Sequence, residues 1–317
     1  MYQWYTSQNS FFKELEFKIF YSGTLRRVSE VACNSSADLR VQHNNSIDVT
    51  RLVSVPLTVV RIVPILKGLC DDSDTNLKLR IAQCLGAVTA TAAGRRAFDE
   101  HDFYNETLNL LKDENEEVRL ATNIVLQRLI LSPIGADGLV EAGAIPKLIE
   151  RIPKEPDHIL ELLLLTLHVC CLINPHRALE SKGLENVIPL LRSPSPSTRA
   201  HAAIVIKDLT VDAKGRNRVL DLNAITPLLD LCSDEDEMVQ AKALAALMMI
   251  ANATPGRFMA IEQKAIEKLL PLINSGNPEI RLNAIKVLTA LSEAPPGRRR
   301  LIDNFAKEAN IHSWLLE

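Results

Sequence analysis

The sequence predicts an all-α protein built from stacked helical repeats, and three observations carry this prediction. Apolar residues make up 47% of the 317 residues while aromatic residues make up only 4%, which is typical of a helical protein with a long, thin core. A short glycine motif recurs at a fixed interval. Between these motifs, apolar residues recur with the spacing of amphipathic helices.

Glycines mark the repeat. The markers are Gly94, Gly135, Gly215, Gly256 and Gly297. Their intervals of 41, 80, 41 and 41 residues place a further, glycine-free marker near His176. We expect each glycine to adopt the left-handed conformation that ends a helix. An arginine follows the marker in most units, as in Arg95 and Arg216, and we interpret it as a surface or inter-unit contact. No G-x-x-x-x-G-K pattern surrounds the motif, so a phosphate-binding loop is disfavoured.

Each interval has room for three helices. In the unit after Gly215, we expect a short helix around 218–223, a middle helix around 224–232 and a long helix around 237–253. Acidic or small polar residues precede the long helices, as expected for N-caps. Units of about 41 residues with three helices are typical of armadillo repeats. The predicted fold is therefore an armadillo-type right-handed superhelical solenoid of about six to seven three-helix repeats.

The two ends of the chain differ from the array. We assign residues 57–303 to the repeats and residues 304–317 to a C-terminal cap. Residues 1–56 form an atypical segment, because they hold most of the aromatic side chains and break the period. This segment is interpreted as an aromatic-rich arm with a possible degenerate first repeat.

Charge and composition exclude several classes of partner. The net charge of −3 gives no long-range attraction to nucleic acid or to anionic membranes, and no uninterrupted apolar stretch is long enough for a membrane span. The six cysteines form no C-x-x-C motif, so we interpret them as reduced core residues of an intracellular protein. We expect no cofactor and no small-molecule substrate.

Catalytic and metal sites are also not expected. Asp72, Asp74 and Asn76 alternate like calcium ligands, but Leu77 and Gln83 occupy the positions that require glycine and glutamate. Helix capping is the preferred interpretation of these residues. The histidines show no zinc-binding spacing, and no nucleophile motif is present, so we predict that the protein is not an enzyme.

A protein-binding surface is expected on the long helices. The positions seven residues before each marker are Ala87, Arg128, Val169, Asp208, Met249 and Ala290. Armadillo import receptors carry asparagines in this series, spaced by tryptophans, and this chain has neither feature. Our candidate binding residues are Arg128, Lys207, Asp208, Met248 and Met249, with core packing as the alternative for Met249. Arg298 and Arg299 are further candidates for contact with an acidic partner, with a nuclear address or a solvated face as alternatives.

The segment RSPSPSTR, from Arg192 to Arg199, joins a middle helix to a long helix. Ser193 and Ser195 each precede a proline. They are therefore candidates for phosphorylation near a helix start, and a plain connecting loop is the alternative.

Several segments carry a more specific resemblance. GADGLVEAGAIPKLIERIPKEPDHI, KGRNRVLDLNAITPLLDLCSDEDEMVQ and LTALSEAPPGRRRLI resemble the radial spoke head 14 homologues, armadillo-type components of ciliary and flagellar axonemes. The resemblance covers about residues 57–303 and implies a non-enzymatic scaffold of the radial spoke that docks other radial spoke proteins. It also implies a location in the cytoplasm and cytoskeleton, within the axoneme of a cilium or flagellum. The alternative is a general intracellular armadillo adaptor that binds a peptide or protein in its concave groove.

Overall fold

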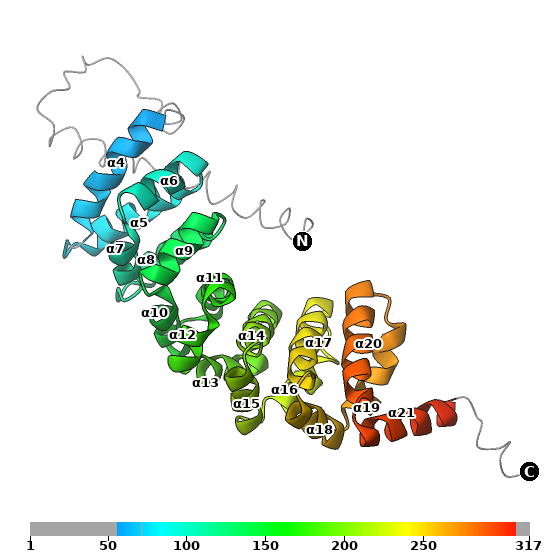
Figure 1. Ribbon diagram of the computed structural model, residues 1–317. Helices are drawn as coiled ribbons and strands as arrows, with labels where there is room; N and C mark the ends of the chain where they lie inside the picture. The colour runs from blue at the N-terminus through cyan, green and yellow to red at the C-terminus, as the bar shows by residue number, and fades with distance from the viewer. Residues whose placement is uncertain (1–55, 71, 309–317) are drawn as a thin grey trace, which may run out of the picture. The chain divides into compact units, whose positions relative to one another are not determined.

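The computed structural model describes residues 56–70 and 72–308, and this part of the chain is helical without any strand (Figure 1). The predicted all-α repeat architecture is confirmed. No helix in the described ranges is both long and apolar enough to cross a membrane. The chain divides into two compact units, residues 1–142 and residues 143–317, and each is described by itself.

In the first unit, helices α5 (Thr75–Thr89) and α8 (Glu116–Leu129) lie side by side with the other described helices around them. These other helices are α4 (Pro56–Leu69), α6 (Ala92–Glu100), α7 (Tyr104–Leu110) and α9 (Pro133–Glu141). The long helices α5 and α8 pack on each other. Phe98 stacks on Phe103 with ring centroids 5.3 Å apart and meets Tyr104 edge-on at 5.2 Å. These rings form the aromatic part of a core that is otherwise aliphatic.

The second unit has two layers. Its long helices are α11 (Asp157–Ile173), α14 (Pro196–Leu209), α17 (Glu237–Ala251) and α20 (Pro278–Ser292). The other elements are α10 (Ala144–Arg151), η1 (Ile152–Lys154), α12 (Pro175–Glu180), α13 (Gly183–Val187), η2 (Ile188–Arg192), α15 (Ala213–Asp221), α16 (Ile225–Leu231), α18 (Thr254–Glu262), α19 (Ala265–Leu269), η3 (Leu270–Asn274) and α21 (Pro295–Glu308). The long helices follow one another in one layer, each packed on the next, and the short helices form the other layer (Figure 1).

Side-chain caps begin most long helices, as predicted. In each case the side chain of the residue before the helix accepts a hydrogen bond from a backbone N–H in the first turn. These capping residues are Asp74, Asn115, Ser195, Asp236 and Asn277. These contacts satisfy amides that have no partner within the helix. Helix α11 begins after Pro156, whose side chain offers no acceptor.

The marker glycines have a different role from the predicted one. Each marker glycine lies in the first turn of the helix that follows a long helix, and none has a positive φ angle. The five are Gly94, Gly135, Gly215, Gly256 and Gly297. A β-carbon at each position would overlap the carbonyl oxygen of the residue six positions earlier, at the end of the preceding long helix. The prediction of a left-handed glycine is therefore wrong. Glycine is required because two backbones approach closely.

The arginine after the marker also has a defined contact. The guanidinium of Arg216 donates to the carbonyl oxygens of Thr210 and Val211, at 3.0 and 2.6 Å. The equivalent arginines Arg95, Arg257 and Arg298 likewise donate to carbonyls at the end of the long helix that precedes them, so each contacts the preceding unit, in line with the inter-unit interpretation. These carbonyls end the long helix and have no intrahelical partner, so the arginine acts as a C-terminal cap.

Left-handed residues do recur, but at another junction. They are Asp102, Gly143, Lys182, Asn223 and Lys264. Each lies between the short helix and the middle helix of its repeat. At Asn223 the backbone forms paired hydrogen bonds, from Asn223 N to Leu220 O and from Ala224 N to Val219 O. This pattern ends the short helix and starts the middle helix.

The predicted segment boundaries, at residues 56 and 304, remain predictions. Two structural observations bear on them. The aromatic-rich segment lies almost entirely outside the described residues, which begin at Pro56, the first residue of α4. The predicted cap begins at residue 304, but α21 runs from Pro295 to Glu308 and crosses that position. The remainder of the cap lies outside the described residues.

The cysteines in the described ranges are buried and free of disulfides, as expected for core residues. They are Cys70, Cys84, Cys170, Cys171 and Cys232. Burial raises the pKa of the Cys84 thiol to about 11 and that of Cys170 to about 12. A thiol with so high a pKa is protonated at neutral pH and is a poor nucleophile.

Candidate functional site

The long helices of the second unit present a repeated row of side chains. The row comes from the same three positions after each helix start. It comprises Leu162, Leu165 and Val169 on α11, His201, Ile204 and Asp208 on α14, Lys242, Ala245 and Met249 on α17, and Asn283, Lys286 and Ala290 on α20. These positions are three and then four residues apart, so they share one face of each helix. We call this set the long-helix row.

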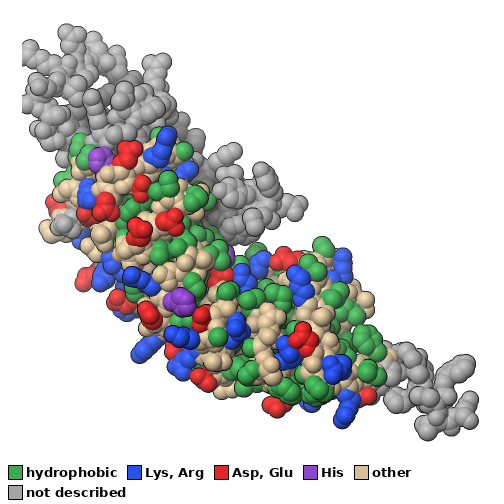
Figure 2. Space-filling model, viewed as in Figure 1, with side chains coloured by type: hydrophobic (Ala, Val, Ile, Leu, Met, Phe, Trp, Pro, Cys, Tyr) green, Lys and Arg blue, Asp and Glu red, His purple; other side chains and the backbone are tan. Residues whose placement is uncertain are grey.

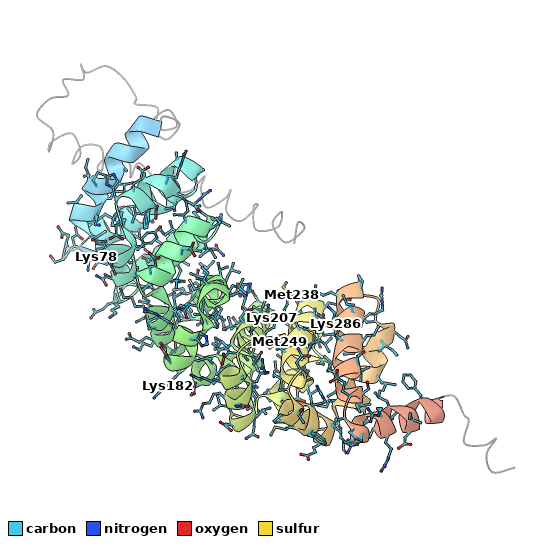
Figure 3. All side chains as sticks on the ribbon, viewed as in Figure 1. Lys78, Lys182, Lys207, Met238, Met249 and Lys286 are labelled. Carbon is cyan, nitrogen blue, oxygen red and sulfur yellow. The ribbon has the colours of Figure 1, made fainter. Side chains whose placement is uncertain are left out.

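Apolar and basic side chains occupy the accessible part of the long-helix row. Ile204, Ala245 and Met249 are half-buried and Lys286 is exposed. Met238, one turn before Lys242 on the same face of α17, is 38% exposed. Figure 3 shows Lys207, Met238, Met249 and Lys286 gathered over α14, α17 and α20, with Lys182 among the short helices. Figure 2 shows hydrophobic and basic side chains interspersed on this unit.

A buried ionic cluster interrupts the row at α14. The side chain of Asp208 is only 1% exposed; one carboxylate oxygen contacts His168 Nδ1 on α11, and the other lies 2.8 Å from Lys207 Nζ. Buried carboxylates are stable only when such partners compensate for lost hydration. The Asp208 carboxylate is thus engaged inside the protein, while half-buried Lys207 stays at the surface.

His201 lies two turns before Asp208 on α14 and is neutral at pH 7. Burial lowers its pKa to about 4; a hydrogen bond with Ser197 opposes this effect, and the charges of His168 and Lys242 add to it. His201 is therefore uncharged at neutral pH, although His168 of the Asp208 cluster and Lys242 both lie near enough to affect its pKa. Lys242 in turn forms an ion pair of 2.9 Å with Glu279 on α20.

The predicted binding residues fall into three groups. Lys207 and Asp208 on α14 stand opposite Met248 and Met249 on the adjacent helix α17, at equivalent positions along each helix. Within the first unit, Arg128 donates to the Gly86 carbonyl of α5, so its guanidinium takes part in helix packing. Their roles in binding remain predictions.

The arginine pair lies on α21 and not on a long helix. Arg298 caps the end of α20 through the carbonyls of Ser292 and Glu293, at 3.3 and 3.2 Å. Arg299 is exposed. Arg300, the third arginine of the same cluster, donates to the Ile261 carbonyl at 2.6 Å. Of these three arginines, Arg299 has the side chain most available to a partner.

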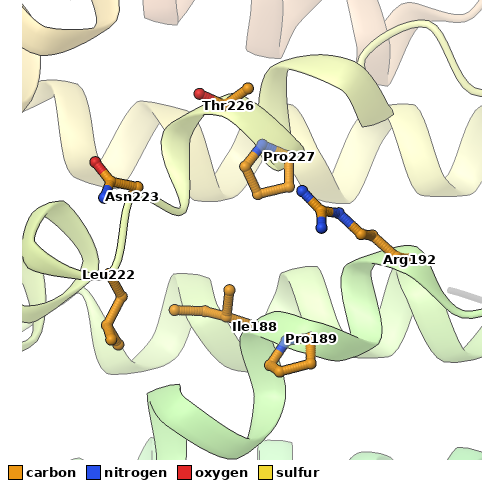
Figure 4. A pocket seen from close by; sticks show the side chains of 7 residues that line it. All are labelled: Ile188, Pro189, Arg192, Leu222, Asn223, Thr226 and Pro227. Carbon is orange, nitrogen blue, oxygen red and sulfur yellow. The ribbon is translucent and has the colours of Figure 1, made fainter.

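One hollow lies among the short helices. It has a volume of about 410 Å³ and is lined by Ile188, Pro189, Arg192, Leu222, Asn223, Thr226 and Pro227 (Figure 4). Arg192 is the only charged side chain in this lining, and the lining offers no pair of acid and base. In the described ranges, no group of three or more histidine, cysteine or acidic side chains is placed to hold a metal ion.

The alternating acids near Asp72 are turn and cap residues. Asp72 accepts the N–H of Asp74 at 2.8 Å, and Asp74 accepts the N–H of Asn76 at 2.9 Å. Both carboxylates thus begin α5, as the capping interpretation predicts.

Comparisons with known proteins agree with this architecture. The family model described as the plant U-box protein ARM repeat region matches residues 173–309. A designed armadillo repeat protein is 20% identical, with a TM-score of 0.66, over 72% of this chain and 99% of that chain. An engineered protein is 19% identical, with a TM-score of 0.67, over 73% of this chain and 96% of that one. A designed armadillo repeat protein in complex with the peptide (KR)4 is 19% identical, with a TM-score of 0.66, over 72% of this chain and 99% of that chain.

These matches identify the fold. The described helices form an armadillo-repeat solenoid, with three-helix units in the order predicted from the sequence. Neither the family model nor these three structures is described as a radial spoke protein. The radial spoke resemblance therefore remains a prediction.

Proposed function

We propose that the protein is a non-enzymatic scaffold whose long-helix row docks a peptide or protein segment. The observation that carries this proposal is that Ile204, Ala245, Met249 and Lys286 are accessible at equivalent positions on three long helices that pack on one another. Rigid helices hold these side chains at a regular spacing, so binding does not require the receptor to fold. Flexible methionines such as Met238 and Met249 adapt to irregular apolar partners.

The charges of the row favour a partner with acidic side chains. Lys242 and Lys286 belong to the row, and Lys207 lies next to Asp208 of the row. The three lysines come from three successive long helices. The carboxylate of Asp208 neutralises Lys207 in part, and that of Glu279 does the same for Lys242. The structure gives Lys286 no ion pair among the described residues. The designed relative described with the peptide (KR)4 binds a basic peptide. We expect this row to favour the opposite charge, because like charges at an interface reduce affinity.

We further propose that the partner belongs to the axonemal radial spoke. This step rests on the sequence resemblance to radial spoke head 14 homologues, with the armadillo fold as a necessary condition. The second candidate is a general intracellular armadillo adaptor, which the same fold and the same row would serve.

A sedimentation experiment separates these two functions. The purified full chain is mixed with demembranated axonemes and centrifuged. A spoke subunit is expected in the axonemal pellet and is expected to resist extraction with the soluble cytosol. Recovery in the soluble fraction alone would favour the adaptor.

Variants test whether the long-helix row makes the contact. Met249→Lys combined with Lys286→Glu changes the row, and we expect it to reduce pelleting at least about tenfold, since hot-spot substitutions commonly cost 2 kcal/mol or more. Lys182→Glu reverses the charge of one lysine among the short helices, as Lys286→Glu does on α20, and is the control for that part of the change (Figure 3). Equal pelleting of both variants would argue against the row as the docking surface.

A further inference from the structure

The turns that precede the long helices are called corners here. The corner between η2 and α14 differs in charge from two others, those before α8 and α17. At two other corners an aspartate pairs with a cation on the preceding long helix: Asp113 lies 3.1 Å from Lys78 Nζ, and Asp234 accepts two hydrogen bonds from Arg199, at 2.8 and 2.9 Å. At the corner before α14 the equivalent position is Ser193. The preceding long helix there presents carboxylates instead of a cation.

Two serine hydroxyls make the contact at this corner. Ser193 Oγ donates to Asp157 Oδ1 at 2.8 Å, and Ser195 Oγ donates to Glu161 Oε1 at 2.8 Å. Thr198 Oγ1 adds a third hydrogen bond to Asp157, at 3.2 Å. Helix α14 is therefore joined to α11 by hydroxyl donors that face two carboxylates.

The backbone at this corner has the form of a kinase substrate. Ser193 has φ −58° and ψ 145°, and Ser195 has φ −76° and ψ 120°, so both residues are extended. Each is followed by an exposed proline, Pro194 or Pro196, in a trans peptide. Both serines are half-buried, so only a small local opening is needed to free the hydroxyls.

We infer that Ser193 and Ser195 form a phosphorylation switch for a proline-directed serine kinase, which releases α14 from α11 at this corner. In the reaction the serine Oγ bonds to the γ-phosphorus of ATP, the bond from that phosphorus to the bridging oxygen of ADP breaks, and the hydroxyl proton leaves to a base of the kinase. This inference does not depend on the proposed docking function.

Phosphorylation changes the sign of the corner contact. The hydroxyl donor is lost, and a group with a charge of about −1.5 to −2 takes its place beside Asp157 and Glu161. Like charges in contact repel, and the repulsion is strongest where burial limits screening. The nearby cations are Arg192 and Arg199, and Arg199 is already paired with Asp234. We therefore expect the corner to open rather than to tighten.

The first test locates the phosphate. The full chain is incubated with a proline-directed serine/threonine kinase and magnesium ATP, and the products are mapped by mass spectrometry. Phosphate is expected on Ser193 and Ser195 and absent there from the double variant Ser193→Ala, Ser195→Ala. Ser132 is also extended and precedes a proline, but its side chain makes no cap hydrogen bond, so it serves as the internal comparison. Modification of Ser132 without either corner serine would overturn the inference.

The second test measures the release. Phosphorylation is expected to accelerate hydrogen exchange of the first α14 amides by about tenfold, as in local opening. The effect should shrink in the variant Asp157→Asn, Glu161→Gln, and also in about 1 M salt, which screens charges beyond about 3 Å. Unchanged exchange after phosphorylation would overturn the inference. So would an equal acceleration in that variant together with no effect of salt.

Discussion

Gly215 packs against the carbonyl oxygen of Leu209 so closely that no β-carbon fits between them. We expect Gly215→Ala to lower the free energy of unfolding by about 3 kcal/mol, because the end of α14 and the start of α15 must separate to admit the methyl group. Denaturant unfolding followed by circular dichroism measures this loss.

Gly276→Ala is the matched control for this prediction. A β-carbon at Gly276 would meet no atom within 4 Å, and its φ angle is not positive. We expect this substitution to be neutral or to stabilise the protein by less than about 1 kcal/mol. A Gly215 variant as stable as the Gly276 variant would contradict the close-approach explanation.

Arg216 is expected to stabilise the protein by capping the C-terminal end of α14. Replacing it with methionine keeps much of the side-chain length but removes the donors to Thr210 and Val211. We expect a loss of about 1–2 kcal/mol in unfolding free energy, the range of hydrogen bonds to charged groups. The control is Arg299→Met, on an exposed side chain, which should change stability by less than about 0.5 kcal/mol. Equal losses from the two variants would contradict the capping role.

The fold was predictable because its signals are periodic. The interval between glycines, the polar residues before each long helix and the apolar spacing all follow from repeated packing, and repetition separates them from chance. The role of each glycine was not predictable, since a left-handed turn and a close backbone approach both select glycine. The positions with positive φ angles were not predicted because they share no residue type that marks them. Lys182 and Lys264 adopt positive φ angles without the usual glycine or asparagine.

For the candidate site, the sequence predicts only which face of the long helices carries it. The series that contains Asp208 and Met249 follows from helical period alone, and the structure places these residues on adjacent packed helices. The pairing of Asp208 with His168 was not predictable, because it joins positions about 40 residues apart whose meeting depends on side-chain rotamers. The carboxylates that face Ser193 and Ser195 were missed for the same reason. A comparison of charge at equivalent corners would have been the signal.

Arg199 and Asp234 should be energetically coupled. Burial alone would raise the pKa of Asp234, but hydrogen bonds from Arg199 and from the backbone N–H of Asp236, with the Arg199 charge, hold it below its usual value. In a double-mutant cycle with Arg199→Met and Asp234→Asn, we expect a coupling free energy of about 1–2 kcal/mol near neutral pH. A folded-state pKa below the unfolded value gives stability that is present above the unfolded pKa of about 3.9. The coupling should therefore fade as the pH drops below that value, and a pH-independent coupling would contradict the assignment.

Because burial lowers the pKa of His201, we expect the protein to lose stability in mild acid. Its pKa is about 4 in the folded protein and about 6.5 in the unfolded chain. Between these values the unfolded chain binds the proton and the folded protein does not, so stability falls as the pH drops from about 6.5 toward 4. The full penalty is on the order of 3 kcal/mol, and it levels off below the folded pKa.

The contribution of His201 can be isolated by substitution. His201→Gln should flatten the difference in unfolding free energy between pH 7 and pH 4.5 relative to the unmodified protein. The corresponding control is His176→Gln, since the His176 side chain is 61% exposed. It should leave the pH profile unchanged. If His201→Gln retains the full acid sensitivity, other groups cause it.

Ile285 and Leu244 occupy equivalent positions on α20 and α17 but have opposite environments. Leu244 is fully buried, at 0% exposure, whereas Ile285 is 49% exposed on the last long helix of the described array. This position faces the next repeat, and only α17 has a following long helix to cover it. We expect Leu244→Lys to abolish cooperative folding, because it buries a charge without a partner. Ile285→Lys should change the unfolding free energy by less than about 0.5 kcal/mol. A large loss in the Ile285 variant, measured by the same denaturant titration, would show that another segment packs on α20 in place of a further repeat.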